Sequence, residues 1–172
     1  GIGRMRLIFC VIILVFLPVS AFGSTYIDDF ELFSFALPHR WIFQARLSTD
    51  YLTVFYGPGE ASILYIENLG KQSELVLPDY VQGIIDAYAG LGGLARFEVD
   101  SVQDIEVARF PAVSVIYSYQ GENKQRLYEK RVFVRVEEWL FTITIGDDAA
   151  AFFDTVGVLD EILASWRWLG VD

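Results

Sequence analysis

Alternating apolar and polar positions predict a series of β-strands along the chain. Phe33, Phe35 and Leu37 are separated by small or polar residues, and this two-residue period places one side of a strand against a core. The Gly-Pro-Gly sequence at 57–59 separates two runs rich in β-branched and aromatic residues, which indicates a hairpin. The strands predicted in this way are 33–37, 51–56, 62–67, 97–107, 113–119, 126–136 and 139–145.

Two segments show the period of an α-helix instead. The first begins near Pro78 and ends before Gly92 and Gly93, with apolar residues three or four positions apart. The second follows Asp147 and Asp148, whose carboxylates suit the N-terminus of a helix. The apolar positions are Val81, Ile84, Ile85, Tyr88 and Leu91 in the first helix and Phe152, Val156, Leu159, Leu163 and Trp166 in the second.

The order of these elements is three strands, a helix, four strands and a helix, which predicts antiparallel hairpins rather than repeated βαβ units. We therefore expect an α+β domain built on an antiparallel β-sheet of about six or seven strands flanked by helices. No repeat, low-complexity tract or long linker divides residues 33–170, so we expect them to form a single domain.

The first 23 residues have the pattern of a secretory signal peptide. Arg4 and Arg6 precede an apolar run at 7–17, and small residues follow as far as Gly23. We expect cleavage after Gly23, a solvated lead-in at 24–32, and a periplasmic or extracellular location. The alternative is an uncleaved N-terminal membrane anchor, which would be the chain's only contact with a membrane.

The scarcity of cysteine and histidine excludes several kinds of site. Cys10, the only cysteine, lies inside the apolar run, so the exported chain would have no disulfide and no thiolate ligand. His39, the only histidine, lies in a predicted turn, and no Gly-x-Ser-x-Gly nucleophile motif is present. We therefore expect no cofactor, no metal site and no enzymatic activity.

The net charge of −10 disfavours binding to nucleic acid. Five basic residues lie close together in sequence and could dock an acidic partner, although solvated positions on a hairpin are the simpler interpretation. Strand alternation should separate the first three of them from the last two. They are Lys124, Arg126, Lys130, Arg131 and Arg135.

Carboxylates are numerous but form no recognised motif. Asp147 and Asp148 are expected to cap a helix, and the acidic residues at 28–31 are expected to be solvated. Calcium binding at one of the clusters and a hydrolase with two paired carboxylates remain remote alternatives.

Tyrosines are the more informative set. Some of their hydroxyls could line a ligand or partner groove between sheet and helix, although core packing is the alternative for each. Trp166 and Trp168, two positions apart on the predicted final helix, should lie on different faces, and Trp168 is then the better candidate for a partner contact. The candidate groove residues are Tyr51, Tyr56, Tyr65, Tyr117, Tyr119, Tyr128 and Trp168.

Several sequence features resemble the PsbP-like superfamily over about residues 33–169. They are Phe-Ser-Phe-Ala-Leu-Pro before Trp41, Leu-Pro-Asp-Tyr-Val-Gln-Gly-Ile-Ile at the first helix, Arg-Phe-Pro-Ala at 109–112, and Trp-Leu-Phe-Thr-Ile-Thr-Ile-Gly at 139–146. The resemblance implies an antiparallel sheet between helices and a binding or assembly role without a shared catalytic centre. The bacterial DcrB-like exported proteins are the branch that the chain resembles most.

These observations favour an exported, non-enzymatic binding or assembly domain that contacts a protein partner in the bacterial cell envelope. The alternative is a carrier whose tyrosine-lined groove holds a small apolar ligand.

Overall fold

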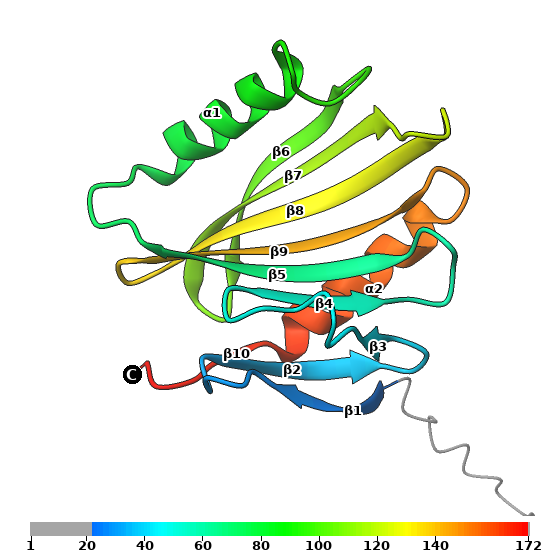
Figure 1. Cartoon of the computed structure of the whole chain (residues 1–172). Coiled ribbons are helices and arrows are strands. Elements are labelled where there is room, and N and C mark those ends of the chain that lie inside the picture. Colours follow the sequence, from blue (N-terminus) through cyan, green and yellow to red (C-terminus); the bar gives the residue numbers. More distant parts are fainter. Residues whose placement is uncertain (1–21, 172) are drawn as a thin grey trace, which may run out of the picture.

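The structure is a computed structural model that describes residues 22–171. Seven antiparallel strands form the main sheet, in the order β3-β4-β5-β9-β8-β7-β6 (Figure 1). Their bounds are β3 Ile42–Phe43, β4 Leu52–Tyr56, β5 Ile63–Lys71, β6 Glu98–Val107, β7 Phe110–Gln120, β8 Arg126–Val136 and β9 Trp139–Asp148. The α+β class and the antiparallel sheet of seven strands confirm the sequence prediction.

A second sheet of three strands lies beside the first. Its order is β1-β2-β10, with bounds Phe22–Ile27, Phe33–Pro38 and Arg167–Trp168. The two helices are α1, Leu77–Ala89, and α2, Phe152–Ser165. No helix within residues 22–171 is both long enough and apolar enough to cross a membrane.

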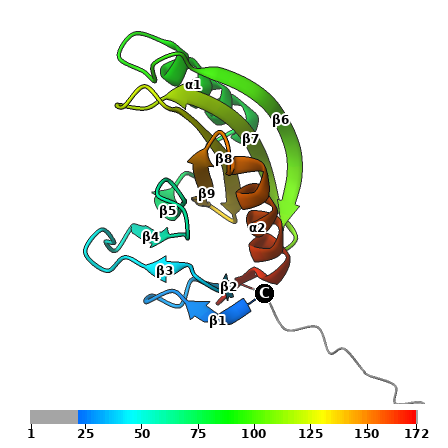
Figure 2. The same ribbon diagram turned by 90° about the vertical axis from the view of Figure 1, so that its right-hand side faces the viewer.

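The helices pack on opposite faces of the seven-stranded sheet, which is visibly curved (Figure 2). Val132 and Val134 of β8 share a core with Leu159 of α2. Phe133, between them, shares a core with Val81 of α1. Because successive side chains of a strand point to opposite faces, these contacts define an α1 face and an α2 face of the sheet.

The small sheet completes the core on the α2 face. Phe33 and Phe35 of β2 are buried, and both rings stack on Trp166, with centroid distances of 4.9 and 5.1 Å. These contacts join the end of α2 to β2 through a continuous aromatic layer.

The prediction of a solvated lead-in over 24–32 is wrong, because most of β1 lies in this segment. Its residues pair with β2 from Ser24 opposite Leu37 to Ile27 opposite Ser34. Asp28 is buried, and its carboxylate accepts backbone N–H bonds from Phe30 and Leu32 at 3.2 Å each. The segment is ordered because β1 supplies backbone partners to β2.

The predicted cleavage position after Gly23 falls within the bounds of β1. The apolar run and Cys10 lie outside the described residues, so the signal peptide stays a prediction.

The prediction that Trp166 and Trp168 lie on a helix is also wrong. The α2 helix ends at Ser165, and Trp168 belongs to β10. Trp168 Nε1 donates a hydrogen bond to the carbonyl oxygen of Val107 at 3.1 Å. The rings of Trp166 and Trp168 are 5.3 Å apart at their centroids, so both belong to the core on the α2 face.

Candidate functional site

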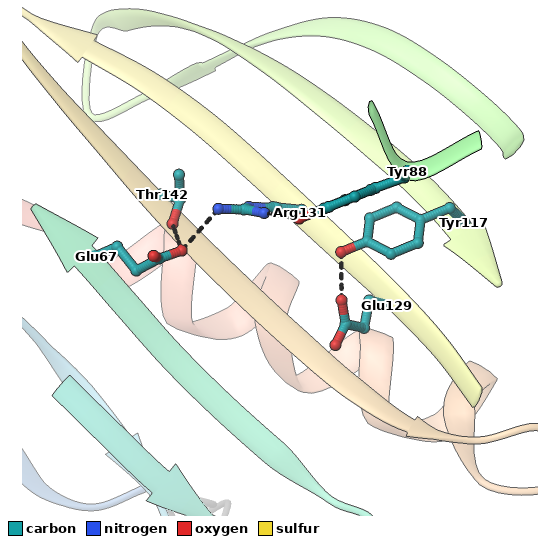
Figure 3. Close-up of polar contacts among 6 residues, drawn as sticks. All are labelled: Glu67, Tyr88, Tyr117, Glu129, Arg131 and Thr142. Atoms are coloured by element: carbon teal, nitrogen blue, oxygen red, sulfur yellow. Dashed lines mark hydrogen bonds and ion pairs between the residues drawn. The ribbon is translucent and has the colours of Figure 1, made fainter. Parts of the chain in front are cut away.

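The α1 face carries a partly buried ion pair that spans three strands. Arg131 of β8 and Glu67 of β5 lie on either side of β9, and Arg131 Nη2 is 2.7 Å from Glu67 Oε1. Thr142 of β9 donates its hydroxyl to the same oxygen at 2.9 Å, and Arg131 also donates to the hydroxyl of Tyr88 at the end of α1 (Figure 3). The pair thereby fixes the C-terminal end of α1 over the sheet.

Glu129, two residues from Arg131 on the same face, has different partners. The hydroxyl of Tyr117 donates to Glu129 Oε2 (Figure 3), and that of Tyr119 donates to Oε1 at 3.3 Å. No basic side chain within residues 22–171 forms an ion pair with Glu129. Its carboxylate is therefore held by tyrosine hydroxyls alone.

Glu129 and the three tyrosines around it, Tyr65, Tyr117 and Tyr119, form the Glu129 cluster. Burial has the largest effect on the pKa of each of these groups. Loss of hydration raises the pKa of Glu129, while the hydrogen bonds from Tyr117 and Tyr119 and the charge of Arg131 lower it. Burial, followed by the nearby charge of Glu129, raises the pKa of Tyr65, Tyr117 and Tyr119. The three tyrosines therefore remain protonated and act as hydrogen-bond donors at neutral pH.

Two buried polar atoms beside this cluster have no hydrogen-bond partner in the described protein. They are Arg131 Nε and Thr144 Oγ1, and their residues are direct cross-strand partners on β8 and β9. Thr144 is fully buried. A buried polar atom without a partner is costly unless water or a ligand satisfies it, so the α1 face retains hydrogen-bonding capacity next to the Glu129 cluster.

A cavity of about 380 Å³ opens at the end of this face and reaches Glu129. We call it the Glu129 pocket. Its lining includes Tyr56, Ile63, Tyr119, Leu127, Glu129 and Gly146. A Cβ atom at position 146 would lie 3.0 Å from Glu129 Cγ, so the glycine leaves the side of the glutamate side chain open to the pocket.

A larger hollow of about 670 Å³ lies over the loop before α1 and is lined by residues 71–76, 79 and 80. It is more open than the Glu129 pocket and contains none of the Glu129 cluster. The Glu129 pocket is therefore the better candidate site.

Five of the six predicted tyrosines lie around Glu129 or at the pocket beside it. Tyr65, Tyr117 and Tyr119 surround Glu129, and Tyr56 lies at the pocket rim with 45% of its surface exposed. Tyr128 borders the pocket, but its ring stacks on Phe152 of α2 at 5.3 Å.

Two further residues of the predicted groove lie elsewhere. Tyr51 is exposed and outside the pocket lining. Trp168 packs in the core on the α2 face. These two residues therefore do not belong to one groove with the others.

The predicted basic docking patch does not form one surface. Arg131 is buried on the α1 face, where Arg135 also binds backbone carbonyl oxygens of Ser73 and Leu75. The other ion pairs of this set join Lys130 Nζ to Asp160 of α2 at 3.4 Å and Arg126 to Glu98 at 3.1 Å. Lys124 lies in the turn before β8. Strand alternation separates these residues, as the sequence predicted.

The predicted capping pair performs two different functions. Asp148 Oδ1 accepts the backbone N–H groups of Ala150 and Ala151 at 3.0 Å each, just before α2. Asp147 is buried and accepts the hydroxyls of Ser62 and Thr155 at 2.6 Å each. The prediction that Asp147 caps the helix is wrong because its side chain points to the opposite face from that of Asp148.

His39, the only histidine, is exposed in the turn after β2. Within residues 22–171, no group of three or more His, Cys, Asp or Glu side chains is arranged to hold a metal ion. Glu67, Glu129 and Thr142 are site residues that the sequence did not predict. The available signal was the presence of charged residues at 129, 131 and 135, on one side of a strand whose centre should be buried.

No family model matches this sequence, and no curated protein matches it either. Among solved structures, the cyanobacterial PsbP protein CyanoP from Synechocystis has a TM-score of 0.64 and 13% identity, over 94% of this chain and 98% of that one. The chain has the PsbP-like fold.

Two further proteins share the PsbP-like fold. The Ran-binding protein Mog1p of Saccharomyces cerevisiae has a TM-score of 0.63 and 10% identity, over 84% of this chain and 94% of that one. LpqN of Mycobacterium tuberculosis, described as involved in cell envelope biogenesis, has a TM-score of 0.55 and 12% identity, over 86% and 85% of the two chains. These identities establish a shared fold.

Proposed function

We propose that this chain is an exported, non-enzymatic binding domain that contacts a protein partner in the cell envelope through the Glu129 pocket. The observation that carries the proposal is the pocket itself, in which tyrosines and apolar residues surround a carboxylate that has no ionic partner among the described residues. A concave site with apolar walls and a few convergent polar groups is typical of recognition.

The hydrogen bonds on the α1 face support a role in binding rather than catalysis. Arg131, Glu67 and Thr142 bind one another, and Glu129 is held by tyrosines. No nucleophile within residues 22–171 is paired with a histidine base, because the only histidine is in an exposed turn. A remote alternative, a hydrolase that uses two carboxylates, would need Glu67 and Glu129 to be free of these bonds.

The relatives with the same fold support the choice of partner and location. One is described as Ran-binding and another as involved in cell envelope biogenesis. Together with the signal-peptide pattern at residues 1–23, they favour a protein partner outside the cytoplasm. The closer relationship to DcrB-like proteins is part of this proposal.

A second candidate function is a small-ligand carrier. The cavity volume of about 380 Å³ supports it, because pockets for small molecules begin at about 300 Å³. The two functions use the same pocket and differ in what enters it.

The direct test is quantitative capture of partners from cell envelopes of the source organism with the tagged full chain. Leu127→Trp fills the pocket, and Val102→Trp adds the same ring at a residue of β6 that is 52% exposed. We expect wild type and Val102→Trp to retain a stoichiometric protein partner and Leu127→Trp to lose it. A partner retained equally by all three proteins would refute the proposal, and a small molecule lost only from Leu127→Trp would favour the carrier.

A further inference from the structure

We infer that the Glu129 pocket binds a primary ammonium group carried on a methylene stem, the chemistry of a lysine side chain. This inference rests on the proposed function, because it names the group that would occupy the same pocket. The charge of the lining, the nature of its walls and its remaining hydrogen-bonding capacity each support it.

The lining is acidic. It contains Glu60, Glu129 and Asp147 and no lysine or arginine. The nearby Arg131 is paired with Glu67, and none of the ion pairs within residues 22–171 includes Glu129, so the carboxylate of Glu129 has no counterion in the described protein. An unmatched carboxylate in a partly desolvated site favours either a proton or a cation, and a ligand ammonium can supply the cation.

The walls suit an alkyl stem with a charged end. Ile63 and Leu127 provide apolar surface along the pocket, and the rings of Tyr56 and Tyr119 are aromatic surfaces of the kind that attract cations. A lysine-like chain buries its methylene groups against apolar surface while its nitrogen bonds a polar partner. Gly146 provides the access, since it leaves the side of Glu129 uncovered.

The acceptors present suit an ammonium group better than a metal ion. Asp147 is already bonded to Ser62 and Thr155, and the described residues offer no arrangement of three metal-ligating side chains. An ammonium group has three donors and no fixed coordination geometry. Glu60 also lines the pocket, so the lining offers a second carboxylate to the three donors of an ammonium group.

The test compares two probes with the same carbon stem by NMR titration of the full chain at about pH 7. They are Nα-acetyl-lysine methylamide and Nα-acetyl-norleucine methylamide, which keeps the stem and lacks the charge. We expect the lysine probe to shift the amide signals of Gly146 and Tyr119, and the norleucine probe to leave them unchanged. Equal binding of both probes, or no binding of the lysine probe, would overturn the inference.

Variants assign the binding to the carboxylate. Glu129→Gln keeps the shape and removes the charge, so it should weaken the lysine probe by at least about tenfold. Glu129→Asp keeps the charge and should retain part of the affinity, and Glu122→Gln in the exposed β7–β8 turn should have no effect. Thermal unfolding establishes that each variant is folded. Undiminished binding by a folded Glu129→Gln protein would contradict the inference.

Two further probes distinguish a partner's lysine from a free amine. Tighter binding of the peptide acetyl-Gly-Lys-Gly-amide than of the diamine cadaverine supports recognition of a protein segment. The reverse order keeps the ammonium inference and overturns the protein partner. If no amine binds while capture of a protein still depends on Leu127, the ammonium inference fails and the proposed function stands.

Discussion

Arg131 and Glu67 form an ion pair across β9, with Nη2 and Oε1 2.7 Å apart and only 9% and 27% of their side chains exposed. Removal of one partner leaves the other charge partly buried. We predict that Glu67→Gln lowers the free energy of unfolding by about 2 kcal/mol, because Arg131 loses its counterion while some solvent still reaches the site. Urea unfolding followed by circular dichroism measures the change.

The matched control is the exposed pair of Lys71 and Glu138, whose side chains are 60% and 46% exposed. Glu138→Gln should change the unfolding free energy by less than about 1 kcal/mol. Equal losses for the two variants would show that the Glu67 pair has no special role in the fold.

Glu129 should make stability depend on pH in a defined direction. Because burial raises its pKa above 4.5, the folded protein binds a proton more tightly than the unfolded chain does. The contribution of Glu129 to the free energy of unfolding is therefore complete below about pH 4.5, and it decreases as the pH rises through the pKa of the folded state. Glu129→Gln removes the group, so its stability relative to wild type should increase from pH 4 to pH 7.

Urea unfolding at several pH values tests this dependence, with Glu122→Gln as the control that should follow wild type. A relative stability of Glu129→Gln that falls with increasing pH would mean that the tyrosine hydrogen bonds, rather than burial, dominate the pKa of Glu129.

Asp147 should matter more to stability than its neighbour Asp148. Asp147→Ala leaves the hydroxyls of Ser62 and Thr155 without their acceptor in a buried site, at a cost of about 3 kcal/mol. Asp148→Ala removes an acceptor for two backbone N–H groups at the start of α2, at a cost of about 1 kcal/mol. A larger loss for Asp148→Ala, measured by urea unfolding, would contradict the assigned roles.

Trp166 should be the main link between α2 and the small sheet. Its ring stacks on Phe33 and Phe35 and is 4% exposed, so Trp166→Ala should cost about 4 kcal/mol. Phe153→Ala on the exposed side of α2 is the control, because that ring is 70% exposed and should contribute about 1 kcal/mol or less. Similar losses in thermal or urea unfolding would refute the role of Trp166.

Hydrophobic periodicity was sufficient to predict six strands of the main sheet, strand β2 of the small sheet and both helices, because each buries a stripe of its own residues. It could not predict β1, β3 or β10, since these strands depend on backbone pairing with β2 or β4 that their own residues do not encode. Trp166 and Trp168 were predicted to lie on a helix because the apolar pattern of α2 continues past Ser165, the residue at which the helix ends.

The candidate site was predictable only in part. Tyr117 and Tyr119 were predicted as groove residues because they share one face of their strand, and Tyr65 because it lies on a neighbouring predicted strand. Glu129 was not predicted, since one sequence does not show that β5, β8 and β9 are adjacent. The ion pair between Arg131 and Glu67 depends on that adjacency, since the two residues are 64 positions apart in sequence.

The measurement that tests the central claim most directly is photocrosslinking in living cells from the pocket rim. A photoreactive side chain replaces Tyr56, which is 45% exposed at the pocket, or Val102, which is 52% exposed on β6. The account predicts one discrete protein adduct from position 56, lost when Leu127→Trp is added, and no such adduct from position 102. An adduct that forms from position 102 alone, or one from position 56 that persists with Leu127→Trp, would contradict it.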